Sequence, residues 1–119
     1  MVLKVSYGEA SFLFPGDIMA AAEKELVDSA DGRLASKVLV APHHGSRSSS
    51  SQVFLDAVNP HMVVVSCSRN SQFKFPHAEV LQRYSDLGVN IYRTDLNGAI
   101  HLSTGGHRIQ IESFISGSP

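Results

Sequence analysis

The sequence has a single cysteine, no tryptophan and no long apolar run. The lone Cys67 cannot form an internal disulfide, so the cysteine count gives no information about the redox compartment. No apolar stretch approaches the roughly 18 residues that span a membrane, and no signal peptide is visible. Ten basic and eleven acidic residues give a net charge of -1, which argues against a broad basic nucleic-acid surface but is compatible with a small basic site.

What is present is enough for one globular domain of 119 residues, with 43% hydrophobic and 18% charged residues. A chain of this size buries roughly two-thirds of its unfolded surface. Residues 2–5 already alternate as a strand does, so we expect residues 1–119 to be a fragment of something longer. Residues 115–119 are biased in composition and are expected to form a flexible tail.

Strand-like and helix-like patterns alternate along the chain. Strands are predicted over 2–7, 10–14, 38–41, 62–65, 90–93, 99–103 and 107–111, and helices over 18–27, 51–58 and 76–88. This order, ββαβαβαβββ, predicts an α/β fold with a mixed sheet and about three helices.

The most informative motif is the histidine pair His43 and His44, held between Pro42 and Gly45 directly after an apolar strand. Imidazoles at a strand end can hold a metal ion. Neighbouring residues in extended backbone point to opposite sides, so one histidine is expected to bind metal and the other to face substrate. The alternative is a pair of hydrogen-bonded loop histidines.

Asp17 follows a strand and the turn Pro15-Gly16, from which its carboxylate could bind or bridge metal ions. The alternative is an N-cap for the next helix. Beyond the histidines, Ser46, Arg47 and Ser49 belong to a serine-rich stretch at a helix start, where free N–H groups favour a phosphate. The alternative is that one of the serines caps the helix and the others are surface residues without a ligand.

A second polar loop, with Arg69, Asn70 and Lys74, follows the buried strand 62–65 and leads to His77 at a helix start. The positive helix end favours a neutral imidazole, which makes His77 a candidate to bind a leaving oxygen. The alternative is a partly exposed histidine without chemistry. Both loops follow strands that are expected to be parallel, and α/β proteins bind ligands there. We assign no chemistry to His61, His101 and His107.

Four ordered pieces carry a family resemblance that covers nearly the whole chain. They are Phe-Leu-Phe-Pro-Gly-Asp (12–17), Val-Ala-Pro-His-His-Gly-Ser (40–46), Phe-Pro-His-Ala-Glu-Val-Leu (75–81) and Tyr-Arg-Thr-Asp-Leu-Asn-Gly-Ala-Ile (92–100). Together they resemble the C-terminal half of the metallo-β-lactamase-like domain in ComEC-type DNA-uptake competence proteins.

The resemblance implies one half of an αββα sandwich and a nuclease that hydrolyses phosphodiesters with two divalent ions, Zn or Mn. It implies that Asp17 bridges the metals. It also implies His44 as a ligand with His43 facing substrate, or the reverse, and His77 as an acid or phosphate ligand. Many relatives carry a histidine where this chain has Phe75, which weakens the match around His77.

The resemblance also implies partners: single-stranded DNA bound through its backbone, the N-terminal half of the domain and a transmembrane channel. The parent protein would lie in the bacterial inner membrane with this domain outside the cytoplasm. The family's first metal motif, His-x-His-x-Asp-His, is absent from the sequence. We therefore expect the isolated chain to be soluble, inactive, self-associating and without bound metal. The alternatives are a hydrolase of small phosphodiesters, a non-catalytic binding module and a plain α/β fragment.

Overall fold

A computed structural model describes residues 2–30, 33–46, 48–66 and 76–113. The elements in chain order are β1 (Leu3–Tyr7), β2 (Ala10–Phe14), α1 (Ala20–Ala30), β3 (Val38–Val40), the 3-10 helix η1 (Pro42–Gly45), α2 (Gln52–Val58), β4 (Met62–Val65), α3 (Ala78–Asp86), β5 (Asn90–Arg93), α4 (Thr94–Asn97), β6 (Ile100–Thr104) and β7 (Ile109–Ser113). The predicted α/β class is confirmed, with η1 and α4 as additions. The tail at 115–119 lies outside the described residues.

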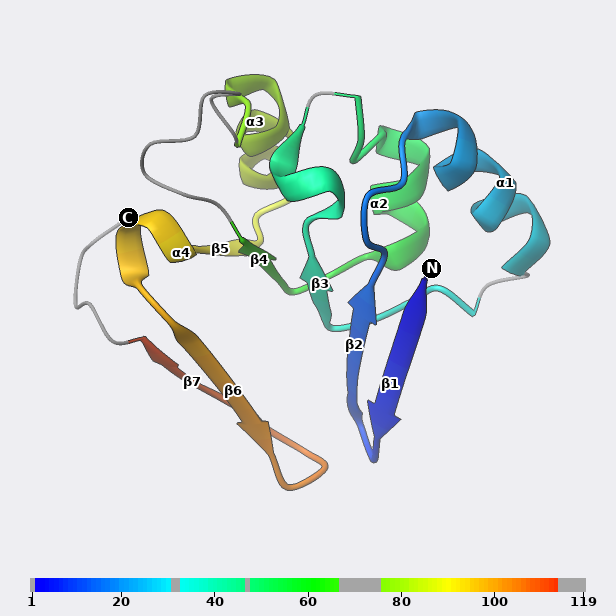
Figure 1. Cartoon of the computed structure of the whole chain (residues 1–119). Helices are drawn as coiled ribbons and strands as arrows, with labels where there is room; N and C mark the ends of the chain where they lie inside the picture. The colour runs from blue at the N-terminus through cyan, green and yellow to red at the C-terminus, as the bar shows by residue number, and fades with distance from the viewer. Residues whose placement is uncertain (1, 31–32, 47, 67–75, 114–119) are drawn as a thin grey trace.

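The strands form a five-stranded sheet in the order β1-β2-β3-β4-β5 and a separate pair, β6 and β7 (Figure 1). β1 runs antiparallel to β2, and β2 to β5 run parallel to one another. The sheet is therefore mixed, as predicted. Because β2, β3 and β4 are parallel and adjacent, the segments that follow them leave the sheet at the same edge.

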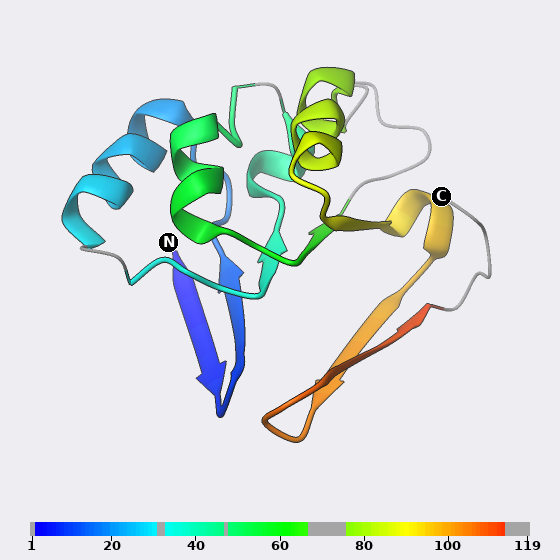
Figure 2. The same cartoon turned by 180° about the vertical axis from the view of Figure 1, so that it is seen from behind.

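Helices α1, α2 and α3 pack on one face of the sheet (Figure 2). The strand residues on that face alternate along each strand, which is why Leu13, Leu39 and Val63 are all buried. From the helices, Phe54 and Tyr84 pack against this row and are fully buried. Burying one such apolar side chain contributes about 1.5–3 kcal/mol, so this layer supplies most of the folding free energy.

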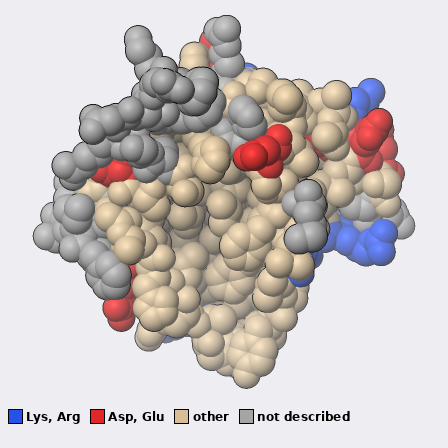
Figure 3. Space-filling model, viewed as in Figure 1, with Lys and Arg blue, Asp and Glu red and all other residues tan. Residues whose placement is uncertain are grey.

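The opposite face carries apolar side chains without a covering helix among the described residues. On β1 and β2 the pairing register brings Leu3 opposite Phe14, and these side chains are 50% and 41% exposed. Val5 and Tyr7 lie on the same face and are also exposed. Figure 3 shows that the surface between the two hairpins is largely uncharged, with most charges toward the edges.

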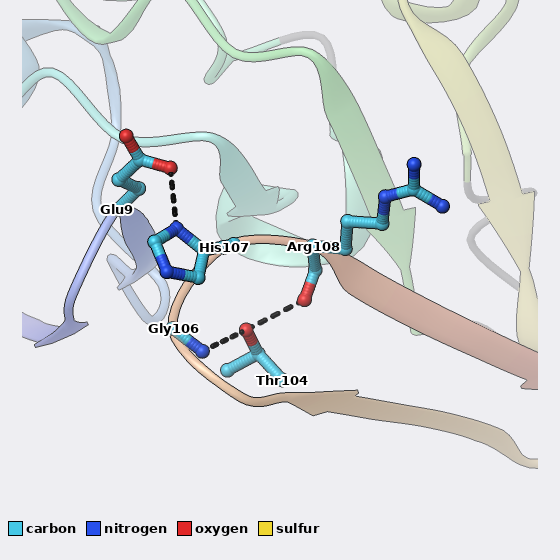
Figure 4. Close-up of polar contacts among 5 residues, drawn as sticks. All are labelled: Glu9, Thr104, Gly106, His107 and Arg108. Carbon is cyan, nitrogen blue, oxygen red and sulfur yellow. Dashed lines mark hydrogen bonds and ion pairs between the residues drawn. The ribbon is translucent and has the colours of Figure 1, made fainter.

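The β6–β7 hairpin meets the turn of the β1–β2 hairpin. The Glu9 backbone N–H donates to the Gly106 carbonyl at 2.6 Å, and His107 Nδ1 lies 3.0 Å from Glu9 Oε2 (Figure 4). A Cβ on Gly8 would come within 2.5 Å of the Gly106 oxygen, so glycine is required for this approach. His107, for which no chemistry was predicted, pairs with the Glu9 carboxylate at the surface.

Candidate metal centre

The predicted site residues gather at the edge of the sheet where β2, β3 and β4 end. Asp17 follows β2, His44 lies in η1 after β3, and Ser66 follows β4. The carboxyl ends of parallel strands are where α/β proteins bind ligands. The parallel pairing of these strands is what brings segments far apart in the sequence to one place.

Asp17 and His44 face each other, with 3.8 Å between Asp17 Oδ1 and His44 Nε2. Their side chains are 74% and 55% exposed, so a ligand can reach both. The other ring nitrogen, His44 Nδ1, lies 2.9 Å from the Ser66 carbonyl oxygen. A carbonyl only accepts, so Nδ1 carries a proton. When the ring is neutral, Nε2 therefore presents a lone pair on the side of Asp17. Metal-binding histidines are oriented by such a bond.

Asp17 was also interpreted as a possible helix N-cap. That interpretation is wrong, because α1 begins at Ala20 and Asp17 lies three residues before it. The carboxylate is therefore not occupied by the start of the helix, and His44 is the side chain found beside it.

The backbone around His44 is tightly constrained. His44 itself has a positive φ of 54°, which is uncommon for a residue other than glycine. Gly45 has a φ of 84°, and a Cβ there would lie 2.6 Å from Pro76 Cβ. The Gly45 carbonyl accepts the His77 N–H at 2.8 Å. This contact joins the histidine segment to the start of α3.

His77 is the N-cap of α3, and its Nδ1 accepts the Glu79 backbone N–H at 3.3 Å. In the neutral ring the proton is then on Nε2, which makes that atom a hydrogen-bond donor. In their neutral forms the two histidines are thus opposite tautomers, with His44 presenting a lone pair at Nε2 and His77 an N–H. This arrangement suits one ligand and one donor to an oxygen.

The serines predicted to cradle phosphate make contacts within the protein. Ser49 is buried and donates its hydroxyl to the Ile18 carbonyl at 2.5 Å. The hydroxyl groups of Ser46 and Ser48 share a hydrogen bond of 2.9 Å. Ser51 occupies the predicted N-cap position of α2, but its hydroxyl makes no capping bond.

Several predicted residues fall outside what the structure describes. Arg47, Arg69, Asn70 and Lys74 lie outside the described residues, as does the side chain of His43. Their proposed roles in binding substrate or metal stay predictions.

Glu23, a fully buried carboxylate on α1, was not among the residues predicted for the site. Its Oε2 accepts the Ser50 N–H at 2.6 Å, and its Oε1 accepts the Ser51 N–H at 2.8 Å. A signal was available, because Glu23 falls on the same side of α1 as Leu26 and Val27, at spacings of three and four residues. An acidic residue within an apolar stripe indicates a buried partner.

A metal ion held by protein alone needs about four ligands, or three when a position stays open for substrate. Within the ranges that the structure describes, no three His, Cys, Asp or Glu side chains come together as a metal site. The Asp17–His44 pair therefore supplies two ligands at most from those residues. No helix among the described residues is long and apolar enough to cross a membrane.

The chain is therefore an α/β protein with a carboxylate–imidazole pair at the carboxyl ends of its parallel strands, the place where α/β proteins bind ligands. No protein-family model matches the chain. Competence protein ComA of Neisseria gonorrhoeae is 42% identical over 104 residues, which are 87% of this chain and 15% of that protein. ComE operon protein 3 of Bacillus subtilis is 30% identical over 100 residues, which are 84% of this chain and 13% of that protein. Recombination protein 2 of Haemophilus influenzae is 30% identical over 111 residues, which are 93% of this chain and 14% of that protein.

These matches support a competence-protein family for the chain. The chain spans about one seventh of the length of these relatives, so it corresponds to one segment of them.

Proposed function

We propose that the chain is the C-terminal half of a metallo-β-lactamase-like domain that hydrolyses DNA during DNA uptake. The observation that carries the proposal is the Asp17–His44 pair, with His44 Nε2 turned toward the carboxylate by the Ser66 carbonyl. Carboxylate oxygen and imidazole nitrogen are suitable ligands for Zn²⁺ and Mn²⁺. The names of the relatives support the link to competence.

The residues present fit a divalent ion but do not complete its shell. Two ions in the complete domain would activate water and stabilise charge on phosphorus. Around them, His77 Nε2–H would donate to a phosphate or leaving oxygen. Arg47, Arg69 and Lys74 would bind the DNA backbone without reading its sequence.

The exposed face of the sheet is evidence for the proposal that a second half of the sandwich packs against this chain. Leu3, Val5, Tyr7 and Phe14 present contiguous apolar side chains on the side away from the helices. A soluble domain covers such a face with another layer. We propose that the N-terminal half of the domain covers it and supplies the first metal motif, and that a channel domain in the inner membrane holds the whole outside the cytoplasm.

The test is to express the chain joined to the coding sequence directly upstream of Met1. We expect the joined protein to bind Mn²⁺ or Zn²⁺ and to cleave single-stranded DNA. Asp17→Asn and His44→Ala should each lower cleavage at least a hundredfold. The matched control is His101→Ala, an exposed histidine on the β6–β7 hairpin, which should leave cleavage unchanged.

The outcomes separate the alternatives. Hydrolysis of small phosphodiesters without cleavage of DNA would replace the nuclease by a small-ester hydrolase. A joined protein that binds neither metal would leave a non-catalytic binding module, and the proposal would be wrong. Cleavage that survives both substitutions would show that the Asp17–His44 pair has no catalytic part.

A further inference from the structure

The segment Ser48–Ser51, here called the serine bridge, contacts both α1, which follows Asp17, and α3, which follows His77. It follows His44 in the chain and leads into α2. Ser49 and Ser50 are buried, although neither is an apolar residue. Ser50 has a positive φ of 57°, a conformation that a residue other than glycine adopts only when its surroundings hold it.

The serine bridge is bonded to the stretch that follows Asp17. The Ala20 N–H donates to the Ser48 carbonyl at 2.8 Å, and the Ser49 hydroxyl donates to the Ile18 carbonyl at 2.5 Å. Both bonds lie within three residues of Asp17. They tie the turn that carries the carboxylate to the serine bridge, which begins four residues after His44.

Glu23 completes this connection one turn further along α1. Its two oxygens accept the N–H groups of Ser50 and Ser51, so one side chain fixes two successive peptide groups. These N–H groups precede the first turn of α2, where a negative charge is favourable. A buried carboxylate is retained only where such bonds replace its water shell.

Helix α3, which begins beside His77, binds the same segment. The Tyr84 hydroxyl shares a hydrogen bond of 2.6 Å with the Ser50 hydroxyl. Arg83 donates to the Ser50 carbonyl at 3.1 Å and to the Ser49 carbonyl at 3.4 Å. The stretch after Asp17 and helix α3, which follows His77, are thus both bonded to the serine bridge, and the bridge itself follows His44 in the chain.

We propose that Glu23 is a positioning residue that sets the separation of Asp17 and His44 by holding the serine bridge against α1. His44 is held from its own side by the Ser66 carbonyl and by the packing of Gly45 against Pro76. Asp17 lies on an exposed turn, so its distance from His44 depends on how that turn is held. The buried bonds between α1 and the serine bridge fix the two turns relative to each other. The proposal rests on the proposed function where it concerns metal affinity, and on this structure alone where it concerns the geometry.

The test compares Glu23→Gln with Glu25→Gln, an exposed residue on the same helix. Glutamine keeps the shape but turns an amide N–H₂ toward one backbone N–H, so one of the two bonds is lost. In the joined protein, Mn²⁺ or Zn²⁺ affinity should fall about tenfold to a hundredfold for Glu23→Gln, as for other residues that orient ligands. Glu25→Gln should stay within about twofold of the unchanged protein.

Affinity is measured by calorimetry at a temperature where thermal melts find each variant folded. A purely structural role for Glu23 lowers the melting temperature and leaves the affinity of the folded protein unchanged, which would overturn the proposal. Tyr84→Phe is the second variant, since it removes one bond to Ser50 and keeps Glu23. It should weaken metal binding in the same direction but less.

The geometric part is tested without metal, in the 119-residue chain. Nitrogen chemical shifts of the His44 ring and the amide signals of Asp17 should change in Glu23→Gln and not in Glu25→Gln. Unchanged signals in Glu23→Gln would overturn the proposal. If the unchanged joined protein binds no metal, the proposed function fails, while the ring signals still decide whether Glu23 positions the pair.

Discussion

Leu13 and Phe14 are neighbours on β2, and they differ sharply in their surroundings. Leu13 points to the helices and is 1% exposed, whereas Phe14 points to the other face and is 41% exposed. Both are large apolar residues, so hydrophobicity alone does not distinguish them. The difference arises because α1, α2 and α3 all pack on one side of the sheet. The helix-covered face therefore stabilises this chain. The other face is buried at Ala10 and Val38, but its exposed residues on β1 and β2 are available to a further layer.

The largest expected effect separates the two faces directly. Leu13→Ala should lower the free energy of unfolding by about 2–5 kcal/mol, because it leaves a cavity in the packed layer. Phe14→Ala should cost less than about 1 kcal/mol, since much of its side chain is already in water. Urea unfolding of both variants measures the difference. Equal costs would mean that the outer face is packed in the isolated chain.

A pH titration tests how well the helix-covered face excludes water. Burial raises the pKa of Tyr84 to about 12, with the Ser50 hydrogen bond acting in the opposite direction. The unfolded chain loses this proton near pH 10 and the folded chain only near pH 12, so stability should be fully present below pH 10 and fall between the two values. The loss approaches about 3 kcal/mol. Unfolding of Tyr84→Phe, compared with the unchanged chain, should lack this alkaline decline.

Helix α1 carries a buried glutamate, Glu23, and an exposed one, Glu25, which allow the same comparison between buried and exposed side chains. Glu23→Ala leaves two backbone N–H groups without their partner and should cost about 1–3 kcal/mol. Glu25→Ala, on the exposed side, should change stability by less than about 0.5 kcal/mol. Chemical denaturation measures both. A small cost at Glu23 would indicate that water replaces the carboxylate at the serine bridge.

The smallest effect on stability is expected on the uncovered face. The double variant with Tyr7→Ser and Phe14→Ser should change the free energy of unfolding by less than about 1 kcal/mol but reduce self-association of the chain. Leu87→Ser is the control, an exposed apolar residue at the end of α3. Sedimentation equilibrium measures the oligomeric state. If only the control reduces association, the contact lies on the helix side.

Local sequence patterns were sufficient for most of the secondary structure. The apolar run at 62–65 and the alternation at 10–14 predicted β4 and β2 with the bounds that the structure has. Helix ends were less well predicted, since α1 was expected from residue 18 and begins at Ala20. Residues 99–103 and 107–111 were expected to form a terminal hairpin, and β6 and β7 do pair in this way. Their separation from the five-stranded sheet was not predicted, because the partners of a sheet depend on contacts distant in sequence.

The candidate site could be predicted only in part for the same reason. Asp17 and His44 were selected from their places after strands, and the structure brings them together. The role of the Ser66 carbonyl could not be predicted, because a backbone oxygen leaves no mark in the sequence. Glu23 was overlooked because its partners are backbone N–H groups 27 and 28 positions away.

The close approach of Gly45 to Pro76 has a consequence for recognising related chains. No side chain fits at position 45 unless the start of α3 moves away, whatever chemistry the neighbouring histidines perform. A relative that has lost His44 but keeps this glycine and proline would retain the same packing between the two loops. The Gly–Pro pair therefore identifies the architecture and the histidine identifies the candidate metal site, so an alignment can follow the two features separately.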